Sequence, residues 1–262
     1  MEPTDTLLSL DMSPHDCYYR FRRDFNYIST VIYVHVRDLG IIPQDCQTYG
    51  PDVIKELGKA VEVWNQQWTT LTVFRRDGKI QWLQDDWKPH SLPPHVVLKD
   101  VPCVNVLDLN VERLLKNRIF KNCPFEFELE YMVRELRAYN MLRERGCTLI
   151  PTISAYVFER SDNQIIGFIC EEFKGDFAGP DNYAECKRSL LQLHSYGLIH
   201  GDLNKFNIII TANGPRFFDL EKSIFDSDIG LSEHEFSRLQ EEELNGLEKA
   251  LRDEEGWGKP WL

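Results

Sequence analysis

Residues 198–210 read LIHGDLNKFNIII and are the most informative part of this chain. They contain the spacing H-x-D-x-x-x-x-N, and an apolar strand is predicted directly after it. Twelve residues after Asn207, the sequence FFDLE at 217–221 places Asp219 at the end of a second predicted strand. Turn residues at 212–215 lie between the two strands. We therefore predict a hairpin that returns Asp219 beside Asn207.

An aspartate, an asparagine and a second aspartate in this order suit phosphoryl transfer from ATP. The reaction needs placement and charge neutralisation more than covalent help from the protein. Asp202 can sit beside the acceptor hydroxyl, while Asn207 and Asp219 offer the hard oxygen ligands that Mg²⁺ prefers. Each residue alone is also explained by a loop hydrogen bond, a turn or a cap. The ordered combination of helix, glycine, H-G-D, asparagine, strand, turn and aspartate favours a catalytic site.

This pattern resembles the catalytic and metal-binding loops of the protein-kinase-like superfamily, H-R-D-L-x-x-x-N and D-F-G. The variant H-G-D-L-N, with D-L-E at 219–221, is similar to the compact members of the superfamily. These are the aminoglycoside and choline phosphotransferases, the RIO kinases, the small atypical kinase of the KEOPS complex and short fungal kinase-like proteins. The resemblance covers about residues 110–225. It implies a bilobal α+β fold with a small antiparallel-sheet N-lobe and a short, mainly helical C-lobe.

The resemblance also implies roles for single residues. Asp202 corresponds to the catalytic base, and Asn207 and Asp219 correspond to the metal ligands. His200 corresponds to the histidine that braces the loop. The implied cofactors are ATP and Mg²⁺. The implied acceptor is a hydroxyl group, either of a Ser/Thr side chain in a protein or of a small molecule.

A lysine and a glutamate are expected to complete the nucleotide site. An amphipathic helix is predicted from Phe127 to Arg145, and Glu135 within it is the best candidate for the glutamate that holds the phosphate-binding lysine. Lys121 lies at a predicted strand end, 14 residues before Glu135, and is favoured over Lys99, which lies 36 residues before it. The alternatives to Glu135 on neighbouring helix faces are Glu128 and Glu130.

The sequence GFICEEFKG at 167–175 resembles the strand and hinge that hold adenine in the superfamily. The hinge acts through its backbone, so the carbonyl of Glu171 and the amide of Phe173 are the expected purine contacts. Cys170 is expected at the back of the pocket. A buried strand that meets a loop is the plainer interpretation, and the two are compatible.

The chain also departs from the superfamily pattern. No G-x-G-x-x-G precedes either lysine, and Gly201 replaces the arginine of H-R-D. Asn204 stands where many protein kinases have a lysine, and only 43 residues follow Asp219. The missing glycine-rich motif favours an alternative, a catalytically weak or inactive pseudokinase that binds nucleotide or acts as a scaffold. The retained Asp202, Asn207 and Asp219 oppose it, because a scaffold has no physical need for all three.

The bulk composition limits the function classes. The 262 residues carry a net charge of −12, which argues against general nucleic-acid binding, because phosphate backbones need clustered Lys and Arg. No segment has the roughly 18 consecutive apolar residues of a membrane-spanning helix, and the acidic residues 1–5 lack the features of a secretory signal. Seven cysteines without a C-x-x-C pair indicate reduced thiols. We therefore expect a cytoplasmic or nuclear location and no membrane contact.

Two regions are expected along the chain. Residues 1–90 form an N-terminal α+β extension of unknown role, which is a possible surface for a protein partner. Residues 91–262 form the kinase-like domain, with an N-lobe at about 91–172 and a C-lobe at about 173–262. Between them, residues 85–94 contain three prolines and indicate a linker. In the extension, residues 1–24 are polar with mixed charge, and we predict a strand at 25–37, a helix at 51–64 and a hairpin of strands at 68–74 and 79–83.

Further elements are expected in the kinase-like region. Strands are predicted at 95–98, 101–109, 114–120, 153–158 and 165–172, and helices at 183–196 and 231–255. Three features outside the motif have plain interpretations. They are His194 as packing at a helix end, the run Glu241–Glu243 as a solvated helix face, and Trp64, Trp68, Trp82 and Trp87 as core of the extension.

Overall fold

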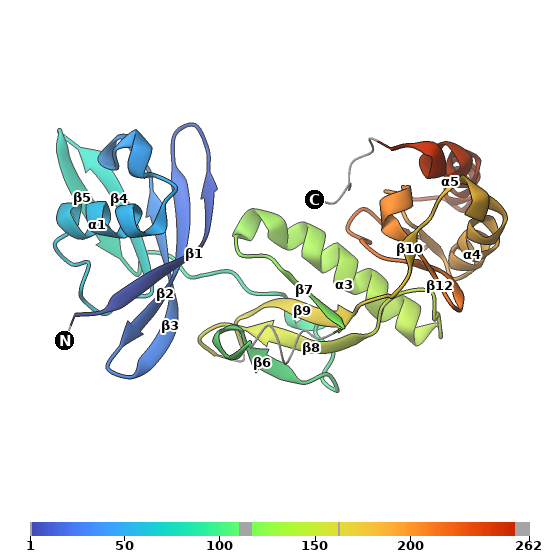
Figure 1. The fold of residues 1–262 in the computed structure, drawn as a ribbon, viewed down its shortest axis with the longest axis horizontal. Helices are drawn as coiled ribbons and strands as arrows, with labels where there is room; N and C mark the ends of the chain where they lie inside the picture. The colour runs from blue at the N-terminus through green and yellow to red at the C-terminus, as the bar shows by residue number, and fades with distance from the viewer. Residues whose placement is uncertain (1, 110–116, 162, 255–262) are drawn as a thin grey trace.

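The computed structural model describes residues 2–109, 117–161 and 163–254. Three parts follow one another along the long axis of the molecule: a five-stranded N-terminal unit, a four-stranded sheet with a long helix, and a helical part (Figure 1). The fold is mixed α/β, with its main sheets early in the chain and helices later, as predicted. In the described residues, every helix is too short or too polar to cross a membrane.

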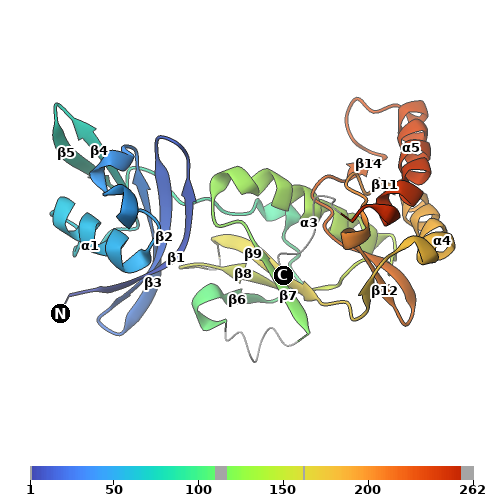
Figure 2. The same cartoon turned by 45° about the horizontal axis from the view of Figure 1, so that its top comes forward.

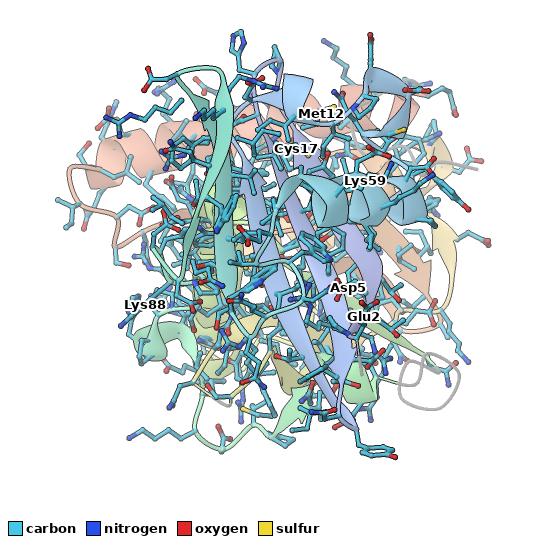
Figure 3. The ribbon with its side chains drawn as sticks, turned by 90° about the vertical axis from the view of Figure 1, so that its left-hand side faces the viewer. Glu2, Asp5, Met12, Cys17, Lys59 and Lys88 are labelled. Carbon is cyan, nitrogen blue, oxygen red and sulfur yellow. The ribbon has the colours of Figure 1, made fainter. Side chains whose placement is uncertain are left out.

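The N-terminal unit is an α/β layer with its own core. Its sheet has the order β1-β2-β3-β4-β5, in which only the β3–β4 pair is parallel, and α1 makes the crossover between those two strands. Figure 3 views this unit end on, with α1, which carries Lys59, lying across the sheet. Trp64 and Trp68 are buried in its core, as predicted. The elements are β1 (Thr4–Met12), β2 (Cys17–Phe25), β3 (Ile28–Val36), α1 (Gly50–Ala60), β4 (Thr70–Arg76) and β5 (Lys79–Gln84).

The first two strands are absent from the sequence prediction, which left residues 1–24 as a polar stretch. That prediction is wrong because the charges in β2 find partners only in the folded chain. Arg23 is buried and donates to Asp5 of β1 at 2.7 and 2.8 Å. A guanidinium paired in this way no longer opposes burial, and so a strand with several charges can lie inside the sheet.

The second part contains the sheet and helix that position the candidate site. The strand order is β6-β8-β9-β7, with β6 parallel to β8 and the other pairs antiparallel. The helix α3 packs on this sheet through Leu136 and through Tyr139, whose ring meets Phe168 edge on. The elements are β6 (Cys103–Asn105), β7 (Arg118–Asn122), α3 (Leu129–Glu144), β8 (Ile153–Phe158) and β9 (Ile165–Glu171).

One predicted strand in this part is wrong, and a second is confirmed over only three residues. Residues 95–98 and 101–109 were expected to be extended, but short 3-10 helices occupy Pro94–Val96 and Val106–Asp108, and β6 has only three residues. The prolines at 93 and 94 set the backbone angle of a turn and lack an N–H for a sheet ladder. Of the strand predicted at 114–120, residues 114–116 lie outside the described residues.

The third part is short and has two described helices, which lie side by side at one end of the molecule (Figure 2). Its core is continuous with that of the preceding sheet, because Leu190 and Phe217 belong to the same buried cluster as Leu136 and Phe168. The elements are β10 (Asp176–Phe177), α4 (Tyr183–Ser195), β11 (Leu198–Ile199), β12 (Ile208–Thr211), β13 (Gly214–Phe217), β14 (Ile224–Phe225) and α5 (Glu233–Arg252).

A buried charge attaches the N-terminal unit to the second part. Glu159 follows β8, is fully buried, and accepts hydrogen bonds from Arg20 of β2 and from the hydroxyl of Tyr33 in β3. The Nε–Oε1 distance to Arg20 is 2.6 Å. A carboxylate buried without such partners would be strongly destabilising. The contact therefore fixes the five-stranded unit to the β8–β9 turn in addition to the covalent linker.

Candidate active site

Lys121 lies at the centre of a cluster of acidic side chains. It is near the end of β7, and its Nζ is 2.8 Å from both carboxylate oxygens of Glu135 in α3. The same nitrogen is 2.8 Å from Asp219, which follows β13. One lysine therefore joins a strand, a helix and a loop from opposite halves of the kinase-like region.

A third carboxylate in this cluster was not selected from the sequence. Glu221 approaches Lys121 to 3.3 Å, and together with Glu135 and Asp219 it forms a set whose oxygens lie within 4.8 Å of one another. The sequence held a signal for it, because Glu221 lies only two residues after Asp219 in the D-L-E segment. Three carboxylates against one lysine leave a local excess of negative charge.

The charges of the cluster act on its pKa values. Burial alone would lower the pKa of Lys121, but the charges of Glu135 and Asp219 outweigh it and hold the pKa above the usual value. Lys121 is therefore protonated at neutral pH. Burial raises the pKa of Glu135, and the nearby charge of Lys121 opposes that rise. A cation added to the cluster would reduce the repulsion that remains among the three carboxylates.

The loop between β11 and β12 carries the H-G-D-L-N motif in a closed hydrogen-bond network. His200 is buried, and its Nε2 donates to the carbonyl of Phe218 at 3.0 Å while its Nδ1 accepts from the amide of Asp202 at 3.3 Å. Asn207 donates from Nδ2 to the carbonyl of Asp202 at 2.9 Å. These two hydrogen bonds fix the backbone of Asp202, so the loop sets the position of its carboxylate.

Backbone conformation explains one departure from the superfamily pattern and the position of Asp219. Gly201 has a φ of +79°, and a Cβ at this position would clash with the carbonyl oxygen of Lys222. An arginine therefore cannot replace Gly201 in this loop without moving the backbone. Asp219 also has a positive φ, of 63°, a conformation that aspartate and asparagine tolerate better than other side chains. The unusual backbone turns Asp219 toward Lys121.

Glu243 of α5 anchors the loop that carries the H-G-D-L-N motif. It accepts from the amides of His200 and Gly201 at 3.2 and 2.7 Å, and from the ring of His194 at 2.7 Å. The expectation that Glu241–Glu243 forms a solvated face is therefore wrong for Glu243, whose side chain is only 8% exposed. Burial alone would raise the pKa of Glu243, but the hydrogen bonds from His194 and Gly201 outweigh it and lower the pKa below the usual value of 4.5.

We expect Glu243→Gln to lower the free energy of unfolding by about 2–3 kcal/mol at pH 7, because an amide cannot accept from both loop N–H groups and loses the charge-assisted bonds. Differential scanning calorimetry should show a melting temperature lower by about 4–8 °C. Because the pKa is lowered by folding, the wild-type advantage is complete above about pH 4.5 and declines as the pH falls through the lowered value.

The matched control is Glu241→Gln, which changes the same charge on an exposed residue of the same helix. Its unfolding free energy should stay within about 0.5 kcal/mol of wild type at every pH. Equal destabilisation of both variants would show that the net charge of α5 matters rather than the contact with the loop.

The other sequence candidates lie elsewhere. Lys99 is exposed, and Glu130 pairs with Arg134 at 3.7 Å on the outer face of α3. Glu128 accepts from the amide of Phe125 at 3.1 Å, and so it caps the short 3-10 helix Glu126–Glu128 that precedes α3. Of the alternatives weighed from the sequence, only Lys121 and Glu135 are in contact with each other.

The segment predicted to hold adenine follows β9. Glu171 ends β9, and its amide donates to the carbonyl of Thr152 at 3.0 Å. In the described part of the chain the amide of Phe173 makes no hydrogen bond and is available to a ligand. Cys170 is buried beside this segment, and burial raises the pKa of its thiol to about 12. The thiol is therefore protonated at neutral pH and behaves as an apolar side chain next to this segment.

A cavity of about 720 Å³ also borders this segment. Glu171 and Phe173 form one side of it, and Tyr139 of α3 and Arg216 of β13 form others. Its lining contains neither Lys121 nor the catalytic loop. The cavity is therefore distinct from the acidic cluster.

Comparison with known families supports this description. A family model for the RIO domain matches residues 179–233, which include the catalytic loop and Asp219. The RIO domain is an atypical protein-kinase-like family, and the match confirms the predicted resemblance to that superfamily. The match covers less than a quarter of the chain and supports, at the level of the family, an ATP-binding phosphotransferase. A search of curated proteins found no match to the chain.

Proposed function

We propose that this protein is an ATP-dependent kinase that transfers the γ-phosphate to a hydroxyl group of a protein Ser/Thr side chain or of a small molecule. The observation that carries the proposal is the position of Lys121, which is 2.8 Å from both Glu135 and Asp219. A lysine held between a helix and a loop in this way has a fixed place from which to bind phosphate oxygens. A merely structural ion pair would not need a third, partly exposed carboxylate.

The donor set fits Mg²⁺. Asp219 and Glu221 present carboxylate oxygens, and the amide oxygen of Asn207 accepts no hydrogen bond within the described residues, since Asn207 is held through its Nδ2. Hard oxygen donors that leave positions for phosphate are typical of Mg²⁺ sites. When bound, Mg²⁺ would neutralise charge on the phosphate oxygens.

Each side chain has one task in the proposed reaction. Lys121 leaves Asp219 and Glu221 to bind the α- and β-phosphates, while its ion pair with Glu135 orients it. Asp202 accepts the proton of the acceptor hydroxyl as the new O–P bond forms, and the electron pair of the broken P–O bond leaves with ADP. The backbone at Glu171 and Phe173 holds the purine. Residues 1–90 remain a possible surface for a protein partner.

The test is the fate of labelled ATP with the purified full chain. The protein is incubated with γ-labelled ATP, with and without Mg²⁺, and label is followed in inorganic phosphate, in the protein itself, in an added basic protein and in hydroxyl-bearing small molecules. We expect Mg²⁺-dependent transfer to at least one hydroxyl-bearing acceptor. Binding of Mg²⁺–ATP without any transfer would favour the pseudokinase alternative, which the missing glycine-rich motif supports.

A further inference from the structure

Lys222 contacts the proposed catalytic base, and neither the motif nor the family comparison assigns it a role. Its Nζ is 3.1 Å from Oδ1 of Asp202. The Lys222 side chain is 57% exposed and that of Asp202 is 31% exposed, so both can reach a bound substrate. The inference drawn from this contact rests on the proposed kinase function.

The backbone fixes Lys222 opposite the catalytic loop. The strands β11 and β14 pair antiparallel, with Leu198 opposite Phe225 and Ile199 opposite Ile224. Continuing this register places Gly201 opposite Lys222, and the clash that a Cβ at Gly201 would make is with the carbonyl of Lys222 itself. The contact with Asp202 is therefore built into the pairing of the two segments and does not depend on the lysine side chain alone.

Leu220 and Ser223, which flank Glu221 and Lys222, anchor this turn. Leu220 is fully buried in the main core, and Ser223, also fully buried, donates from its hydroxyl to the carbonyl of Leu220 at 2.8 Å. The turn is thus rigid on both sides of Lys222. The flexible Lys222 side chain can therefore change its ion-pair partner while the backbone of the turn stays in place.

Two other lysines of the candidate site are already paired with carboxylates. Lys121 is held among three carboxylates, and Lys205 is 2.6 Å from Glu254. Asn204, at the position where many protein kinases have a lysine, is used inside the loop: it donates to the carbonyl of Asp202 at 3.1 Å and accepts from the amide of Phe206 at 2.9 Å. Lys222 therefore supplies the positive charge that Asn204 cannot.

We infer that Lys222 is a catalytic cation that pairs with Asp202 in the resting protein and moves to the transferred phosphoryl group when substrates bind. Its departure frees Oδ1 of Asp202 to take the hydroxyl proton as the acceptor oxygen bonds to phosphorus. Its charge then stabilises the oxygens of the phosphoryl group while the bond to the ADP oxygen breaks.

The test compares Lys222→Ala and Lys222→Arg with wild type and with Lys249→Ala, an exposed lysine of α5. Mg²⁺–ATP affinity is measured by thermal shift, and single-turnover transfer is measured to water or to the best acceptor found. We expect Lys222→Ala to lower the transfer rate by about 10²–10³-fold, with ATP affinity within about threefold of wild type. Lys222→Arg should recover at least about tenfold of that loss, since it retains the charge.

Several outcomes would overturn the inference. Transfer by Lys222→Ala within about twofold of wild type would remove any catalytic role, while the kinase function would stand. A higher acceptor KM with unchanged kcat would assign Lys222 to acceptor binding instead. A wild-type protein that binds Mg²⁺–ATP and transfers nothing would overturn the kinase function together with the inference.

Discussion

Replacing Asp219 with asparagine is expected to abolish the Mg²⁺-dependent part of ATP binding. Asp219 contacts Lys121 at 2.8 Å and belongs to the carboxylate set that fits a divalent cation. The wild-type protein with ATP at about 100 times its Kd should gain about 2.7 kcal/mol of unfolding free energy. Asp219→Asn should lose the difference between the melts with and without Mg²⁺, because a neutral amide is a far weaker ligand.

The choice of asparagine separates the metal from the fold. Asp219 has a φ of 63°, which asparagine adopts nearly as well as aspartate, whereas Asp219→Ala adds backbone strain. The matched control is Asp181→Asn, which removes an exposed carboxylate near the start of α4. A full Mg²⁺-dependent shift in Asp219→Asn would exclude Asp219 as a metal ligand.

The second large effect is expected for Asp202. Asp202→Asn and Asp202→Ala should bind Mg²⁺–ATP with wild-type affinity but transfer phosphate about 10²–10⁴-fold more slowly. Binding is spared because, in the described residues, the Asp202 carboxylate contacts Lys222 and lies outside the acidic cluster around Lys121. The measurement is single-turnover transfer of label from γ-labelled ATP, with Mg²⁺ saturating.

Asp181→Asn again serves as the control and should transfer at the wild-type rate. Normal turnover by either Asp202 variant would show that the proposed mechanism is wrong. Loss of ATP binding in both variants would place Asp202 in the nucleotide site instead. Since Asp202 is partly exposed, both variants should melt within a few degrees of wild type without ligand.

Local spacing explains why the catalytic segment could be predicted from the chain alone. His200, Asp202 and Asn207 lie within eight residues of one another, and a hairpin brings Asp219 back to them. Phe218 donates its amide to the carbonyl of Asn207 at 3.2 Å, so the predicted return of the chain is present. Short-range geometry of this kind follows from turn and strand patterns.

The three helices of residues 117–254 were also predicted correctly from the sequence. The predicted helix at 127–145 corresponds to α3, and those at 183–196 and 231–255 correspond to α4 and α5. Their buried faces follow the repeat of apolar residues. The strands of the N-terminal unit were only partly visible, because β1 and β2 carry charges whose partners lie elsewhere in the chain.

The sequence by itself determined the kinase-like character of this protein, through one short motif whose chemistry depends on neighbours in the chain. Only the tertiary structure showed that Glu243 and Glu221 also serve that motif. Glu243 lies 42 residues from Gly201 and Glu221 lies 100 residues from Lys121, and each looks like an ordinary surface acid in the sequence. Whether a side chain is buried, which groups it contacts and how its charge is compensated depend on contacts between residues far apart in the sequence. A local sequence pattern does not encode such contacts.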